Sequence, residues 1–184
     1  MARTESNMPR LGINAPNFSL TNVITQKQVT LEDITGKYGF VVMFICNHCP
    51  FVKHVIEEVV RICNDYRVQG FGFVAISSND ITQYPEDAPE LMAVVAEENR
   101  FSFPYLYDET QEVAKAYNAA CTPDFFVYDA QKRLVYRGQL DDSRPGNRIP
   151  VNGRDLREAL DNILSNRPQN KIQKPGIGCN IKWK

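Results

Sequence analysis

The chain has 184 residues, of which 43% are hydrophobic and 23% are charged, as is typical of one globular domain with a hydrophobic core. Its net charge of −1 argues against nucleic acid or an anionic membrane as the main partner. Five cysteines are too few and too unevenly spaced for a secreted disulfide scaffold, residues 1–6 lack the apolar core of a signal peptide, and no apolar run approaches the length of a membrane span. We therefore expect a cytoplasmic protein, in which any disulfide is transient and catalytic or redox-sensing.

The first predicted elements build a sheet around one buried strand. They are strands at 18–20, 29–31 and 39–45, a helix from Pro50 that ends before Gly70, and a strand at 71–77. The run at 39–45 is almost entirely apolar, as expected of a strand that is buried on both faces. The strand–helix–strand order predicts a right-handed parallel crossover. Cys63 falls on the apolar stripe of the helix and is expected to be a core residue.

In the second half of the chain, helical patterns alternate with strand patterns. Its predicted elements are a helix at 90–99, an extended piece at 104–107, a helix at 109–119, strands at 125–128 and 134–137, and a helix from about Gly153. The helix at 109–119 is expected to turn Val113, Ala116 and Tyr117 inward. We find no repeat and no linker, so we predict one domain over residues 1–184 with its core at about 11–165.

The last segment, residues 166–184, is a basic tail. It contains Arg167 and four lysines but no acidic residue, and the remainder of the chain is therefore acidic overall. The tail also carries Ile172, Ile177, Ile181 and Trp183, which favour docking onto the domain over disorder.

The most informative motif is Cys46-Asn47-His48-Cys49, which joins the buried strand to the helix. A helix N-terminus over the first sulfur stabilises a thiolate and lowers a thiol pKa from about 8.5 to roughly 3.5–7.5. We therefore expect Cys46 to be the more exposed and more acidic cysteine. The alternative is half of a zinc site, for which the sequence lacks a second Cys/His pair of ligand-like spacing.

The element order, with Cys-x-x-Cys after the first core strand and Thr122-Pro123 before a later one, resembles the thioredoxin superfamily. Residues 14–20 (Asn-Ala-Pro-Asn-Phe-Ser-Leu) and the long insertion before the third core strand resemble its redoxin and peroxiredoxin (AhpC/TSA-type) branch. The tail Gly-Cys-Asn-Ile-Lys-Trp-Lys at 178–184 is similar to that of bacterial peroxiredoxin-like proteins that keep Cys-x-x-Cys. The resemblance implies an α/β thioredoxin-like fold: a central mixed β-sheet flanked by helices, with an N-terminal β-hairpin, a helical insertion and a C-terminal tail.

The resemblance also implies roles for individual residues. Cys46 matches the attacking cysteine and Cys49 the resolving one. Pro123 matches the cis-proline of thioredoxins, and with Thr122 it would form an edge that binds the substrate peptide. His48 lies between the cysteines, where its cation would favour the Cys46 thiolate.

Some features depart from the family patterns. Residues 39–45 contain no counterpart of the buried carboxylate of thioredoxin. Against the peroxiredoxin pattern, Cys49 aligns with the peroxidatic cysteine, but Cys46 replaces the threonine that helps to hold peroxide. The arginine that such a site needs is unassigned, with Arg137 and Arg144 as candidates. His54 is expected on the surface.

Two further cysteines are candidates for the same site. Cys121 directly precedes Thr122, so the fold would bring it close to the redox pair, as a substrate-binding residue or as a small residue in a tight loop. Cys179 would be an additional exchanging thiol if the tail packs near the site, or else a buried anchor for the tail. The glycines at 176 and 178 would allow a close backbone approach.

The sequence thus predicts a thiol–disulfide oxidoreductase that uses a Cys46–Cys49 disulfide in cell redox homeostasis. Its partners would be a protein or small-molecule disulfide, or a peroxide, and a thiol-based reducing system. No cofactor is expected, because the sulfurs carry the electrons and no Gly-rich nucleotide motif is found. One alternative is a peroxiredoxin-like peroxidase with Cys49 or Cys46 as the peroxidatic cysteine. Another is a copper, zinc or iron–sulfur protein that uses Cys46, Cys49 and Cys121 with His48 or Cys179.

Overall fold

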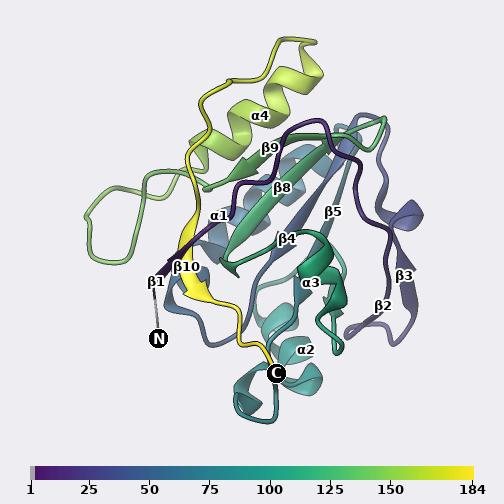
Figure 1. Ribbon diagram of the computed structural model, residues 1–184, viewed down its shortest axis with the longest axis vertical. Coiled ribbons are helices and arrows are strands. Elements are labelled where there is room, and N and C mark those ends of the chain that lie inside the picture. The colour runs from purple at the N-terminus through teal and green to yellow at the C-terminus, as the bar shows by residue number, and fades with distance from the viewer. Residues whose placement is uncertain (1–2) are drawn as a thin grey trace.

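The computed structural model describes residues 3–184, which form a seven-stranded mixed sheet and a three-stranded sheet with helices packed around them (Figure 1). The large sheet has the order β3 (Gln28–Thr30), β2 (Ser19–Asn22), β6 (Tyr105–Tyr107), β5 (Phe71–Ser77), β4 (Gly39–Phe44), β8 (Asp124–Asp129) and β9 (Leu134–Gly138). The small sheet has the order β1 (Arg3–Glu5), β10 (Ile177–Asn180) and β7 (Cys121–Thr122). The helices are α1 (Pro50–Arg67), α2 (Pro89–Glu98), α3 (Glu112–Ala116) and α4 (Arg154–Leu164), with 3₁₀ turns η1 (Glu32–Ile34) and η2 (Pro85–Asp87).

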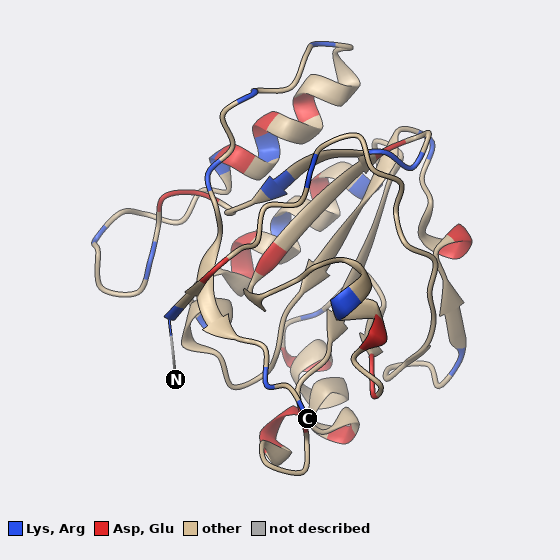
Figure 2. Cartoon of the chain, viewed as in Figure 1, with Lys and Arg blue, Asp and Glu red and all other residues tan. Residues whose placement is uncertain are grey.

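The strand β4 is the centre of the fold. All six of its residues are buried, and it pairs in parallel with β5 and antiparallel with β8. Alternate residues serve the two faces: Val41 and Met43 pack in the cluster that includes α1 and α4, whereas Phe40 and Phe44 pack with α3. Neither β4 nor β5 carries a charged residue, and the charges gather on helices and loops (Figure 2). Two-sided burial explains the apolar run that predicted this strand.

The helix α1 follows the sequence prediction closely. It begins with a proline at its first position, where a missing N–H costs nothing. Its inner face is apolar, and Cys63 on that face is 1% exposed, so its assignment to the core is confirmed. Among residues 3–184, no helix has the length and apolarity that a membrane crossing requires.

The helix predicted at 109–119 is shorter than expected. Gln111 takes a left-handed backbone conformation, with φ of 64°, and α3 starts only after it. The side chain of Gln111 is used instead to hold Ser78 and the C-terminal tail through its amide. As a result Ala114 is buried and the predicted inward residue Ala116 is exposed, so that detail of the prediction was wrong.

The tail docks onto the domain through a strand that the sequence analysis did not predict. The strand β10 lies between β1 and β7, and Ile181 beyond it is 1% exposed. Docking is partial, however, because Ile172 is 83% exposed and Trp183 is 40% exposed. The tail therefore begins in solvent and ends against the body of the protein, where Lys184 bonds Glu109 and Gln111 just before α3 (Figure 1).

Candidate functional site

Two cysteine sulfurs meet where β4 ends and α1 begins. Cys46 follows β4, and Cys49 is the N-cap residue of α1. The Cys46 Sγ lies 3.3 Å from the Thr122 Oγ1, and the Cys49 Sγ lies 3.1 Å from the main-chain oxygen of Thr122. All five cysteines of the chain are free thiols in this structure. The Cys-x-x-Cys pair thus faces β7, the short strand that contains Thr122.

A third thiol contacts the same pair. Cys179 in β10 places its Sγ 2.9 Å from the Cys49 Sγ, although 130 positions separate the two residues. In the pairing of β10 with β7, Cys179 stands opposite Thr122. The tail does pack near the site, which was the condition under which Cys179 was considered as an exchanging thiol.

The three sulfurs hold a negative charge most easily at Cys49. The hydrogen bond from the Cys46 thiol is the main reason that the pKa of Cys49 falls to about 5, and the Cys179 thiol and the Val52 N–H act in the same direction against the effect of burial. Donation to Cys49, burial and the charge of Asp87 all raise the pKa of Cys46. Burial and the contact with Cys49 raise the pKa of Cys179 to about 12. The reduced site is therefore one thiolate between two thiols.

The acidic thiol is the second of the pair, so the expectation that Cys46 would be the more acidic cysteine was wrong. The helix begins at Pro50, so its dipole and its unpaired N–H groups act on Cys49. Exposure does not distinguish the two, since Cys46 is 2% and Cys49 is 0% exposed. The main-chain oxygen of Thr122 can accept a hydrogen bond only from the protonated thiol of Cys49, and so it favours the thiol. The Cys46 thiol, the Cys179 thiol and the Val52 N–H favour the thiolate, and together they have the larger effect.

A buried carboxylate, Asp87, holds the two residues between the cysteines. It has no exposed surface, and its Oδ1 accepts the main-chain N–H of Asn47 at 2.7 Å and that of His48 at 3.3 Å. Its Oδ2 accepts the Asn79 amide at 2.7 Å. Sequence reasoning missed this residue, because nothing in the pattern of the insertion at 80–89 links an aspartate there to a motif 40 positions earlier.

The imidazole of His48 pairs with Asp87 as well, with 2.6 Å between Nδ1 and Oδ2. The ring stacks on Tyr84, with centroids 5.5 Å apart, and within the described part of the chain its Nε2 is buried without a hydrogen-bond partner. We expected this side chain to favour the Cys46 thiolate directly. In the structure its ring nitrogen instead bonds the carboxylate that anchors the loop.

The segment after α3 brings Cys121, Thr122 and Pro123 to the site. The Thr122–Pro123 peptide bond is cis, as the resemblance implied. Cys121 is fully buried, and its Sγ lies 3.8 Å from the Ser6 Oγ and from the Pro123 oxygen. Thr122 thus contacts the sulfurs of both Cys46 and Cys49, whereas the Cys121 sulfur contacts Ser6 and Pro123.

A second buried carboxylate lies beside β4. Asp124 in β8 is paired with Phe44, the last residue of β4. Its Oδ1 accepts the Ser6 hydroxyl at 2.7 Å, and burial raises the pKa of this carboxyl to about 7. Residues 39–45 contain no acidic residue, but the neighbouring strand β8 places the buried carboxyl of Asp124 beside the end of β4.

The two candidate arginines are engaged elsewhere. Arg137 donates to the Pro9 oxygen and to Gln173, and the guanidinium of Arg144 donates to Gln139 and to nearby main-chain oxygens. Neither is seen to bond a cysteine within residues 3–184. His54, expected on the surface, is half-buried and bonds Ser143.

The ligand atoms of Cys46, His48 and Asp87 lie within 4.8 Å of one another. This cluster differs from the metal site considered from the sequence, because Asp87 takes the place of the other cysteines. The carboxylate already accepts N–H groups from Asn47, His48 and Asn79, so its lone pairs serve the loop. The arrangement is therefore suited to holding the loop that carries the cysteines.

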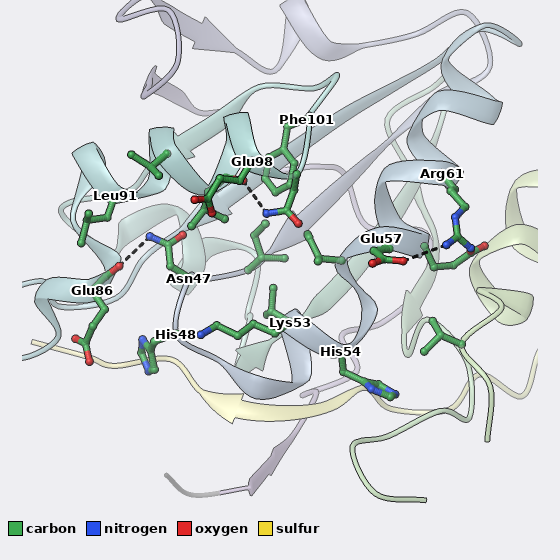
Figure 3. A pocket seen from close by; sticks show the side chains of 18 residues that line it. Asn47, His48, Lys53, His54, Glu57, Arg61, Glu86, Leu91, Glu98 and Phe101 are labelled. Carbon is green, nitrogen blue, oxygen red and sulfur yellow. Dashed lines mark hydrogen bonds and ion pairs between the residues drawn. The ribbon is translucent and has the colours of Figure 1, made fainter. Parts of the chain in front are cut away.

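A cavity of about 970 Å³ opens beside the loop, between α1 and α2. Asn47 and His48 stand at one end, and Arg61 stands at the other (Figure 3). The side chain of Asn47 is fixed by a hydrogen bond to the Glu86 oxygen. The cavity thus reaches the residues between the cysteines.

Comparison with known proteins identifies the family. The model of the AhpC/TSA family matches residues 11–137. The chain belongs to this family. A search of curated proteins gave no match.

Solved structures show the fold. An uncharacterized conserved protein from Geobacillus kaustophilus is 62% identical with a TM-score of 0.98, covering 100% of this chain and 97% of its own. A hypothetical protein from Sinorhizobium meliloti 1021 is 45% identical with a TM-score of 0.96, covering 98% of each chain. A putative thiol:disulfide interchange protein from Chlorobium tepidum is 18% identical with a TM-score of 0.66, covering 84% of this chain and 98% of its own. This AhpC/TSA-family chain has a thioredoxin-like fold, as predicted.

Proposed function

We propose that this AhpC/TSA-family protein is a thiol–disulfide oxidoreductase whose redox couple is the dithiol and disulfide of Cys46 and Cys49. The observation that carries the proposal is that both sulfurs of one Cys-x-x-Cys loop contact Thr122, with the Cys46 Sγ 3.3 Å from its Oγ1 and the Cys49 Sγ 3.1 Å from its main-chain oxygen. A hydrogen bond from the Cys46 thiol lowers the pKa of Cys49 in the same loop. A thiolate is the nucleophile of disulfide exchange, and a second thiol in contact with it completes the reaction.

The proposed reaction has two exchange steps. The Cys49 thiolate attacks a substrate disulfide, a mixed disulfide forms, and the electron pair of the broken bond leaves with the first substrate thiol, which takes a proton. Cys46 then loses its proton and attacks the Cys49 sulfur. The second substrate thiol leaves, and the Cys46–Cys49 disulfide remains. This order reverses the roles that the resemblance implied for the two cysteines.

Neighbouring residues have supporting roles in this proposal. The Thr122 hydroxyl, 3.3 Å from Cys46, stabilises the thiolate that Cys46 becomes before it attacks. Pro123 and Cys121 shape the segment that presents Thr122, and His48 holds the loop through Asp87. The sulfurs carry the electrons, so the substrate is a protein or small-molecule disulfide and a thiol-based reductant regenerates the dithiol. Such cycling suits a reducing compartment such as the cytoplasm.

The test is to equilibrate the full chain in buffers of reduced and oxidised glutathione, trap thiols with an alkylating agent in acid, and map disulfides by peptide mass spectrometry. We expect a Cys46–Cys49 disulfide in the wild type and in Cys63→Ala, a control in the core of α1, and its loss in Cys46→Ser. Metal content is measured on the same preparation. A wild type that never forms this disulfide, or whose pair is blocked by bound metal, contradicts the proposal.

Hydrogen peroxide replaces oxidised glutathione in a parallel experiment. We expect oxidation of the pair by peroxide to be much slower than by the disulfide, because neither candidate arginine bonds a cysteine in the described structure. Faster oxidation by peroxide would favour a peroxidase with Cys49 as the attacked residue.

A further inference from the structure

The strand β10 covers the edge of β7 beside the redox pair. It pairs antiparallel, with Cys179 opposite Thr122 and Asn180 opposite Cys121. An exposed strand edge binds extended peptides by main-chain hydrogen bonding. Here a segment of the same chain occupies that edge, so β10 has the geometry of a peptide bound at the site.

The fit between the two strands is close enough to require glycine. A Cβ atom added to Gly178 would lie 2.0 Å from the Thr122 oxygen, and one added to Gly176 would lie 2.7 Å from the Ser6 Oγ. Any side chain at 178 would therefore move β10 away from β7. This close approach brings the Cys179 sulfur into contact with Cys49.

The segment beyond β10 is fastened by main-chain hydrogen bonds. The Ile181 N–H donates to the Ala120 oxygen at 3.1 Å, and the Lys182 N–H donates to the Asn79 side chain at 2.8 Å. The Lys182 oxygen accepts the Asp80 N–H at 2.8 Å. Just before β10, the Gly176 oxygen accepts the Ser6 N–H at 2.9 Å and the Lys174 oxygen accepts the Gln139 N–H at 3.1 Å, whereas the tail is exposed around Ile172. The thiol of Cys179 is thus held at the site from both sides of β10.

We propose that β10 is a tethered substrate-like strand that delivers Cys179 to Cys49 as a third redox thiol, so that the Cys46–Cys49 disulfide rearranges to a Cys49–Cys179 disulfide. The inference rests on the proposed function, which supplies the first disulfide. The Cys179 thiol loses its proton and attacks the Cys49 sulfur, the bond between Cys49 and Cys46 breaks, and its electron pair stays on Cys46, which takes up a proton. No net electron is gained or lost, so no further oxidant is needed.

The surroundings of the sulfurs favour this exchange. The Cys49–Cys179 contact of 2.9 Å already brings the attacking sulfur to its target, and tethering makes the step intramolecular. Oxidation of Cys49 removes the negative charge that helps to raise the pKa of Cys179 in the reduced protein. The Thr122 hydroxyl at 3.3 Å from Cys46 can donate to the thiolate that leaves.

Docking of β10 also has a consequence for substrates. A protein disulfide that binds by adding a strand to β7 must compete with β10 for the same edge. Release of β10 would therefore open the edge and remove Cys179 from the site in one motion.

The experiment compares the full-length wild type with Cys179→Ser, Cys46→Ser and Cys46→Ser/Cys179→Ser. Each is oxidised with oxidised glutathione, quenched in acid over a time course, alkylated and mapped by mass spectrometry. We expect the wild type to form Cys46–Cys49 first and Cys49–Cys179 later, and Cys179→Ser to retain Cys46–Cys49 alone. Cys46→Ser should lose its glutathione and form Cys49–Cys179, whereas the double variant should keep glutathione on Cys49.

A second comparison tests the docking of the strand. Gly178→Ala should slow the appearance of Cys49–Cys179 by about tenfold or more, while leaving the thiol in place, and the exposed tail variant Ile172→Ala should match the wild type.

Two outcomes separate the two proposals. If the wild type and Cys179→Ser both form Cys46–Cys49, but neither the wild type nor Cys46→Ser ever yields Cys49–Cys179, the third thiol is refuted and the dithiol enzyme stands. If neither the wild type nor Cys179→Ser forms Cys46–Cys49, the proposed function itself fails.

Discussion

The Nδ1 atom of His48 lies 2.6 Å from the Oδ2 atom of Asp87, a contact that fastens the loop between Cys46 and Cys49 to the insertion between β5 and β6. The same carboxylate accepts the Asn47 N–H. One buried side chain therefore fixes the shape of the loop and also raises the pKa of Cys46.

Replacing that carboxylate with an amide should make Cys46 more acidic and the protein less stable. The charge of Asp87 contributes to the raised pKa of Cys46, so Asp87→Asn should lower that pKa. Weakening a buried network of hydrogen bonds to a charged group should cost about 1–3 kcal/mol in the free energy of unfolding. The measurements are the pH dependence of Cys46 alkylation, followed by peptide mass spectrometry, and urea denaturation. Glu86→Gln, an exposed neighbour, is the control, and equal Cys46 titrations in the two variants would contradict the assignment.

The acidic Cys49 should dominate the reactivity of the reduced protein. Its pKa of about 5 predicts that its alkylation rate rises as pH increases through 5 and is constant by pH 7. Folded Cys49 binds fewer protons than unfolded Cys49 between about pH 5 and the ordinary value of 9.0, so it contributes stability that increases with pH over that range and is lost as pH falls through 5. The slope should not exceed about 1.4 kcal/mol per pH unit, and Cys49→Ser should lack it. A Cys49 titration near pH 9 would show that the thiolate is elsewhere.

Asp124 should have the opposite effect on stability. Its pKa is raised to about 7 by burial from an ordinary 3.8, so between these values the folded carboxyl keeps a proton that the unfolded one releases. Its contribution to stability therefore falls as pH rises from about 4 to 7. Asp124→Asn should remove this dependence, so that urea denaturation shows the variant gaining stability relative to the wild type between pH 4 and pH 8. A difference between the two proteins that is independent of pH would mean that the carboxyl is ionised throughout.

Cys121 and Cys63 should remain reduced during catalysis. Burial raises the pKa of both thiols, and the Cys121 sulfur contacts the Ser6 hydroxyl and the Pro123 oxygen. During oxidation by glutathione, both should be alkylated only after denaturation, and Cys121→Ala should still form the Cys46–Cys49 disulfide. A disulfide that includes Cys121 would instead make it a member of the redox group.

Trp183 should report on the docking of the tail. It is the single tryptophan of the chain, it is 40% exposed, and Lys115 lies over its ring with 5.8 Å between the ammonium nitrogen and the ring centroid. Fluorescence quenching by acrylamide should therefore be intermediate between that of a buried and a free tryptophan. Gly178→Ala should increase the quenching constant, because its Cβ would meet the Thr122 oxygen, whereas Ile172→Ala should not. Identical quenching in all three proteins would indicate that the end of the tail is held independently of β10.

The sequence alone determined the elements that depend on local pattern. The apolar run of β4, the helical stripe of α1 and the Cys-x-x-Cys between them are adjacent in the chain, so periodicity and helix signals were enough to locate them. The same patterns predicted the hairpin of β8 and β9 and the position of Cys63 in the core. The resemblance added the mixed central sheet flanked by helices and the cis bond before Pro123.

The tertiary structure alone decided which sulfur is acidic and what surrounds it. The sequence placed the start of α1 at Pro50, as the structure does, but it did not show that the Cys46 and Cys179 thiols donate to Cys49 and lower its pKa. Asp87 and Cys179 reach the site from 40 positions and 130 positions away, and Asp124 reaches the end of β4 through strand pairing. Such contacts depend on long-range packing, and the local sequence around Asp87, Cys179 or Asp124 does not predict them. The sequence was therefore enough to predict thiol chemistry at the Cys-x-x-Cys motif. The pKa values of its two cysteines and the contact with a third thiol depend on long-range contacts that only the folded chain makes.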